Sequence, residues 1–150
     1  DEVTSAIKHA PLAVVSGESS EGDRLYLDAV KKLGRLDAQD AIRQVLDAVE
    51  AGLSEKMRAH AFRTLARLAE TGGFTQHAIV AYDALSDINP TDPFAHRELA
   101  RLYQQAPANR PRAQYHLRQA AALAPWDGEL ANALTVMESE WGEHGNLFDA

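Results

Sequence analysis

The sequence of 150 residues contains no cysteine. Without cysteine the chain has no disulfide, no thiolate metal ligand and no cysteine nucleophile. A cysteine-free chain is compatible with the cytoplasm and with the periplasm, so the localisation stays open between these two compartments.

Long hydrophobic runs and an excess of positive charge are lacking as well. The longest apolar stretch, residues 11–15, is far shorter than the roughly 18 residues that a membrane-spanning helix needs, so we expect no membrane insertion. Lysine and arginine number 15 against 22 acidic residues, which gives a net charge of −7. Because a phosphate backbone selects a basic face, this charge argues against a nucleic-acid partner.

Motifs of known catalytic or cofactor sites are also missing. The glycine-containing stretch at residues 16–22 lacks the lysine and the serine or threonine of a phosphate-binding loop. The six histidines form no His-Glu-x-x-His pair, and no two of them are three or four residues apart. We therefore expect no enzymatic activity, no cofactor and no metal site.

What the sequence does contain is an internal repeat. The segment Leu65-Ala66-Arg67-Leu68 returns as Leu99-Ala100-Arg101-Leu102, 34 residues later. Further pairs at spacings of 34 or 35 are Phe62 and His96, Ala69 and Tyr103, Ala78 and Ala113, Tyr82 and Leu117, and Pro90 and Pro125. A period of this length, with each unit reading as helix–turn–helix closed by proline, indicates a solenoid of stacked helix pairs.

The spacing of apolar residues and capping residues predicts where the helices lie. Residues 23–33 and 37–51 have the three- and four-residue spacing of a helix, with Asp37 as N-cap and Gly52 after the C-terminus. A third helix should end at the glycine pair 72–73. Further N-caps are predicted at Ser54, Thr75, Asp92 and Asn109.

This register resembles the tetratricopeptide repeat family, in which a 34-residue unit carries leucine, alanine and aromatic residues at fixed places and ends in proline. The resemblance implies an all-α fold. It would be an α-solenoid of antiparallel helix pairs in a right-handed superhelix, with about three repeats and a C-terminal capping helix. His96 stands where the family has a large apolar residue, and we interpret it as a packing histidine.

The repeat register also divides the chain into domains. Residues 1–21 are predicted to be an N-terminal arm, helical at residues 1–9, or the tail of a preceding repeat. Residues 22–141 form the repeat domain: a weak repeat at 22–55, repeats at 59–92 and 93–127, and a capping helix at 127–141. Residues 142–150 are a C-terminal tail. Because the sequence begins at Asp1 without methionine, we expect either that a signal sequence or propeptide was removed or that this is a piece of a longer protein, and we favour the second interpretation.

In this family the first helices line a concave groove, and the resemblance carries these positions onto the sequence. The predicted partner-binding residues are Tyr26, His60, Arg63, Arg67, Phe94, Arg97, Arg101 and Asn132. Arginine binds carboxylates through two parallel hydrogen bonds, so the ligand should be an extended peptide with acidic side chains or a free C-terminal carboxylate. Alternatively, the arginines are solvated and pair with neighbouring acids such as Glu70 and Glu98.

The function expected from these observations is that of a non-catalytic protein–protein interaction scaffold, of bacterial origin. One alternative is a structural segment of a larger envelope protein in polysaccharide export or secretion, where self-association is also expected. Another alternative is a secretion chaperone, which is similar to this chain in size, acidity and repeat number.

Overall fold

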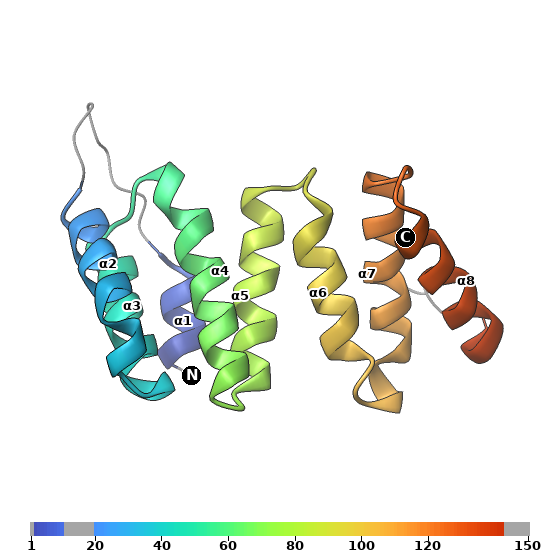
Figure 1. Ribbon diagram of the computed structural model, residues 1–150, viewed down its shortest axis with the longest axis horizontal. Helices are drawn as coiled ribbons and strands as arrows, with labels where there is room; N and C mark the ends of the chain where they lie inside the picture. Colours follow the sequence, from blue (N-terminus) through green and yellow to red (C-terminus); the bar gives the residue numbers. More distant parts are fainter. Residues whose placement is uncertain (1, 11–19, 143–150) are drawn as a thin grey trace. The chain divides into compact units, whose positions relative to one another are not determined.

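A computed structural model describes residues 2–10 and 20–142, and all of their regular elements are helices (Figure 1). The α-helices are α1 (Glu2–Lys8), α2 (Glu21–Lys32), α3 (Ala38–Ala51), α4 (Glu55–Thr71), α5 (Thr75–Ile88), α6 (Pro93–Tyr103), α7 (Arg110–Leu123) and α8 (Gly128–Trp141). The predicted all-α class is confirmed. Within the described ranges, no helix combines the length and hydrophobicity that a membrane span requires.

The helices belong to two compact units, Asp1–Ile88 with α1 to α5 and Asn89–Ala150 with α6 to α8. We call them the first and the second unit. Successive helices pack as pairs, α2 on α3 and α4 on α5 in the first unit, and α6 on α7 in the second. The last helix, α8, packs on α7. The chain is therefore an all-α helical-repeat protein, as predicted.

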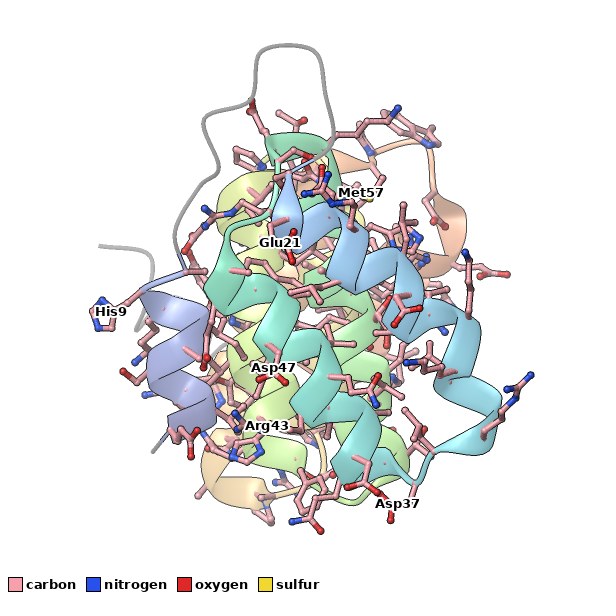
Figure 2. All side chains as sticks on the ribbon, turned by 90° about the vertical axis from the view of Figure 1, so that its left-hand side faces the viewer. His9, Glu21, Asp37, Arg43, Asp47 and Met57 are labelled. Atoms are coloured by element: carbon pink, nitrogen blue, oxygen red, sulfur yellow. The ribbon has the colours of Figure 1, made fainter. Side chains whose placement is uncertain are left out.

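The N-terminal segment is part of the first unit. Its helix α1 packs on α3 and α5, and Ile7 is buried there. An ion pair of 3.1 Å joins Glu2 of α1 to Arg43, which lies on α3 one turn before Asp47 (Figure 2). Of the arm predicted at residues 1–21, residues 11–19 lie outside the described part, as do residues 143–150 of the predicted tail.

Several predicted caps are present with the expected hydrogen bonds. The Asp37 carboxylate accepts from the backbone N–H of Asp40 at 2.8 Å, and that of Asp92 accepts from Phe94 at 3.0 Å. Gly52 follows α3 with a φ of 97°, which favours glycine. In contrast, Ser54 and Asn109 hold the N-cap positions of α4 and α7 without a capping side-chain hydrogen bond. Thr75 is not an N-cap but the first residue of α5.

The first three residues of the repeated Leu-Ala-Arg-Leu segment have the same burial pattern in both units. Leu65 and Ala66 are 2% and 0% exposed, and Leu99 and Ala100 are 0% and 1% exposed. The arginine that follows is exposed in both copies. The alanines allow helix axes to approach closely, while the leucines fill the space beside them. The sequence repeat is therefore a repeat of core packing.

The backbone of α2 begins in close contact with the segment that links α3 to α4. A Cβ added at Gly22 would lie 2.1 Å from the carbonyl oxygen of Gly52, so only glycine fits there. The Ser20 hydroxyl donates to that same oxygen at 2.9 Å, and the Asp23 carboxylate accepts from the Ser54 N–H at 2.9 Å. These contacts hold the first helix pair to the start of α4.

The Asp23 carboxylate is adapted to this buried position. Burial by itself raises the pKa of Asp23, but hydrogen bonds from Ser54 and Ser20 favour the ionised form and outweigh it. The net result is a pKa below the ordinary value for aspartate. This carboxylate therefore stabilises the first unit in its ionised form.

Candidate functional site

The eight predicted partner-binding residues are divided between the two units. Residues 26, 60, 63 and 67 belong to the first unit, and residues 94, 97, 101 and 132 belong to the second. Each unit is therefore considered by itself. A single groove that uses all eight residues stays a prediction.

Tyr26 does not lie on the surface where we expected it. Its side chain is fully buried, and its hydroxyl forms hydrogen bonds with His60 Nδ1 and, at 2.7 Å, with Thr64 Oγ1. Burial raises the pKa of Tyr26, and the hydrogen bond to Thr64 partly opposes this effect. The aromatic ring fills the space between α2 and α4, so the expected contact with a ligand is wrong for this residue. His60, Arg63 and Arg67 are exposed, as predicted.

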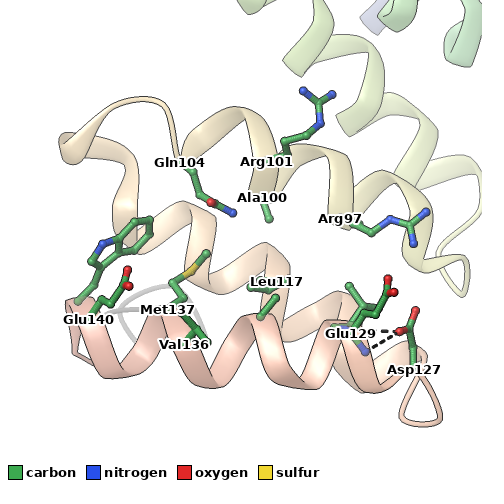
Figure 3. A pocket seen from close by; sticks show the side chains of 13 residues that line it. Arg97, Ala100, Arg101, Gln104, Leu117, Asp127, Glu129, Val136, Met137 and Glu140 are labelled. Carbon is green, nitrogen blue, oxygen red and sulfur yellow. Dashed lines mark hydrogen bonds between the residues drawn. The ribbon is translucent and has the colours of Figure 1, made fainter.

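The second unit contains a groove of about 450 Å³ between α6, α7 and α8 (Figure 3). Its floor consists of Ala100, Leu117, Leu130 and Met137. Ala133 and Val136 of α8 form one rim, and Trp141 lines one end. This volume lies within the range of roughly 300–1,000 Å³ typical of ligand sites, which are also mainly apolar with a few polar groups.

Charged side chains of opposite sign line the two walls of this groove. Arg97 and Arg101 come from α6 and the neutral Gln104 directly follows it, whereas Asp127, Glu129 and Glu140 come from the α8 side. Asp127 is the N-cap of α8, and its carboxylate accepts from the backbone N–H groups of Glu129 and Leu130. The groove is therefore polarised across its width.

The two arginines that line the groove differ in the side chains that they already contact. Arg101 forms an ion pair of 2.6 Å with Glu98 on its own helix, as our alternative interpretation predicted. The guanidinium carbon of Arg97 lies 5.9 Å from the centre of the Phe94 ring. Among the described residues, Arg97, Glu129 and Glu140 form no ion pair. These three charged residues line the groove.

Sequence reasoning located part of this groove. Arg97 and Arg101 line it, whereas Phe94 and Asn132 lie outside the lining. The sequence analysis missed Glu140 and Trp141. Glu140 follows Glu129 at helical spacing through positions 133 and 136, so extending the stripe along the last helix would have found it.

A histidine pair lies elsewhere in the second unit, between α6 and α7. The Nδ1 atoms of His96 and His116 are 3.0 Å apart, and the His116 ring stacks on Tyr103. Burial, followed by the charges of His96 and Arg112, lowers the pKa of His116 to about 4. One of the two Nδ1 atoms must accept this hydrogen bond, so at least one imidazole of the pair is neutral. The pair joins two helices, which agrees with the packing role predicted for His96.

The described residues contain no cluster of three or more histidine or acidic side chains that could hold a metal ion. His96 and His116 lack a third ligand of this kind. The groove therefore offers charge and apolar surface for recognition.

Comparisons with known proteins find a similar fold in a solved structure but no related sequence. No family model matches the sequence, and no curated protein matches it. A chain of the solved structure described as "CopN-Scc3 complex" is similar, with a TM-score of 0.64 and 12% sequence identity. The similarity covers 94% of this chain and 86% of that chain. At this identity it concerns the fold, which is an all-α helical repeat in agreement with the architecture described above.

Proposed function

We propose that the protein is a non-catalytic interaction module of the tetratricopeptide-repeat type, and that the groove of its second unit binds a peptide segment of a partner protein. The observation that carries this proposal is an apolar floor of four side chains below the exposed Arg97 and Arg101. The 34-residue register supports the repeat type. That the similar solved structure is described as a complex supports a protein partner.

The groove provides both affinity and orientation. Apolar side chains of a peptide would displace water from the exposed Ala133 and Val136 above the buried floor, and burial of apolar surface is the main favourable term in association. Arg97 would bind a carboxylate directly. Arg101 must exchange Glu98 for the ligand, so its net contribution is smaller.

The test fills the groove without disturbing the core. Ala133 is exposed and lines the groove, so tryptophan at this position should occupy the space of a ligand. Ala131 lies on the same helix, is equally exposed and does not line the groove, which makes Ala131→Trp a matched control. Both variants should show the circular dichroism and melting temperature of the wild type.

A random peptide library displayed on phage is selected on the immobilised full-length chain, and selected peptides are titrated by calorimetry. We expect Ala133→Trp to weaken their binding by at least about tenfold and Ala131→Trp to leave it unchanged, because a filled pocket excludes its ligand. Equal binding to both variants, or a library without enriched peptides, would refute the proposal.

The second candidate is a secretion chaperone, favoured by the net charge of −7 and by the fold similarity to a chain of a protein complex. A chaperone would form a stoichiometric complex with one client encoded beside it. Co-expression with the products of neighbouring genes, followed by size-exclusion chromatography, tests this. If no such complex forms, the peptide-binding module remains the better proposal.

A further inference from the structure

The charges of the groove are arranged along its length as well as across it. Figure 3 shows Arg97 at the end formed by Asp127 and Glu129, whereas Gln104 lies toward the end formed by Glu140. Both lining cations are thus separated from Glu140. Arg110 stacks on the Trp141 ring at 4.9 Å but does not line the groove.

A purely acidic peptide does not suit this arrangement. Its first carboxylate would meet Arg97 and Arg101, which offset Asp127 and Glu129 at that end, whereas its second carboxylate would meet Glu140, which forms no ion pair among the described residues. Like charges brought together in an interface oppose binding and thereby discriminate between partners. A basic side chain at this end would instead pair with Glu140.

The length of α8 sets the separation of the two charges in the ligand. Glu129 and Glu140 mark the two ends of the groove on this helix, and eleven residues at a rise of 1.5 Å correspond to roughly 16 Å. An extended peptide covers this distance with about five residues. Apolar side chains between the charged ends would lie on the floor formed by Leu117, Leu130 and Met137.

We propose that the groove of the second unit selects a dipolar peptide segment, with an acidic side chain against Arg97 and Arg101, leucine-like residues on the floor and a basic side chain against Glu140. This inference rests on the proposed function, because it specifies the ligand of the same groove. It differs from an acidic ligand or a free carboxylate terminus, because it requires both signs of charge within one segment of about five residues.

Three peptides with blocked ends and the same central leucines test the proposal. One has an acidic and a basic end, one has two acidic ends, and one has two basic ends. Each is titrated by calorimetry into the full-length chain at low ionic strength, where exposed charges are screened least. The dipolar peptide should bind about threefold or more tightly than either of the others, as expected for one additional exposed ion pair.

A pair of variants then tests whether Glu140 is the residue that binds the basic end of the peptide. Glu140→Gln should remove the advantage of the dipolar peptide over the doubly acidic one. Ser139→Lys, at an exposed neighbour outside the groove lining, changes the net charge by the same amount and should preserve that advantage. Loss of the advantage in both variants would indicate a long-range effect of net charge and would overturn the assignment to Glu140.

The outcomes separate this inference from the proposed function. If Ala133→Trp abolishes binding of all three peptides but the wild type binds them equally, the groove is a peptide site and the charge selection is wrong. If the doubly acidic peptide binds best, the selection is likewise wrong. If none of the three binds the wild type while peptides from the phage library do, the dipolar ligand is refuted and the peptide site stands.

Discussion

The two units use their polar side chains in different ways. In the first unit, Ser20, Asp23 and Tyr26 each form a hydrogen bond with a residue at least 31 positions further along the chain. Their polar groups therefore hold one helix pair to the next. In the second unit, Arg97 and Glu140 face a groove and form no ion pair among the described residues. One packing repeat thus supports contacts between helix pairs in one unit and a groove lined by charged side chains in the other.

The repeated segment makes this comparison direct. Arg67 and Arg101 occupy the same place in two copies of Leu-Ala-Arg-Leu, and both are exposed. Arg101 lines the groove of the second unit, where α8 supplies the opposite wall. Position in the repeat therefore sets exposure, while the neighbouring helix decides what an exposed side chain faces.

The largest expected effect concerns the contact between the start of α2 and the segment that links α3 to α4 in the first unit. Gly22→Ala would place a methyl carbon 2.1 Å from a backbone oxygen of Gly52 and 2.6 Å from that of Ala48. Because neither backbone atom can move aside easily, we expect a loss of about 3 kcal/mol in the free energy of unfolding. Urea denaturation followed by circular dichroism measures this loss.

The control for this substitution lies in the second unit. Gly128 at the start of α8 has nothing within 4 Å of an added Cβ, so Gly128→Ala should leave the stability unchanged or raise it slightly. A similar loss in both variants would show that the contact at Gly22 is not the cause.

Acid should weaken the second unit at a higher pH than the first. The pKa of His116 falls from 6.5 to about 4 on folding, so its contribution is complete above pH 6.5 and is lost as the pH falls toward 4. The pKa of Asp23 is lowered from 3.8, so its contribution is lost only below about pH 4. For the partly exposed His116 we expect about 2 kcal/mol after allowance for solvent screening.

Hydrogen exchange detected by mass spectrometry, corrected for intrinsic rates, resolves the two units. Between pH 6.5 and pH 4.5 protection should fall in α6 and α7 and stay constant in α2 and α3. His116→Phe keeps the ring stacking and removes the titrating group, so protection of α6 and α7 should no longer change over this range. A change that persists in this variant would contradict the role of His116.

A smaller effect is expected from the buried hydroxyl of the first unit. Tyr26→Phe removes the hydrogen bonds to His60 and Thr64 and should cost about 1 kcal/mol, the usual net value of a buried hydrogen bond. The hydroxyl of Tyr103 forms no such bond among the described residues, so Tyr103→Phe should change the melting temperature little. Equal losses would mean that the network around Tyr26 does not stabilise the first unit.

The smallest effect concerns the twin arginines. Arg101→Ala should weaken binding of a groove peptide about two- to fivefold, because an exposed ion pair is worth less than about 1 kcal/mol. Arg67→Ala removes the equivalent side chain from the first unit and should leave the affinity unchanged. Calorimetric titration with one selected peptide compares the two. An equal loss would favour a groove shared by both units, as the sequence alone predicted.

The sequence predicted the helices well because their limits depend on local chemistry. Asp37 and Asp92 are recognisable as caps since a carboxylate two or three residues before a backbone N–H can satisfy it without any distant partner. The period of 34 likewise depends on short-range packing of small and large residues. Ser54 forms no capping hydrogen bond because its side chain, like its backbone N–H, is hydrogen-bonded to the distant Asp23 instead.

The site was predicted less completely because it depends on contacts between helices. Tyr26 occupies a groove position of the family pattern, yet a partner for its hydroxyl on α4 makes burial favourable. The residues next to Tyr26 in the sequence do not indicate that its side chain is buried. The opposite holds for Arg97 and Arg101, whose place on the first helix of a pair is enough to expose them. The acidic wall formed by Asp127, Glu129 and Glu140 could be predicted only from the knowledge that α8 forms one side of the groove.

Both tryptophans of the chain lie in the second unit. Trp126 is 80% exposed in the turn before α8, whereas Trp141 is partly buried at the end of the groove. Indole fluorescence therefore originates from this unit alone, with Trp126 in water and Trp141 in the lining of the groove. With Trp126 replaced by phenylalanine, the remaining emission becomes a label-free optical sensor of occupancy.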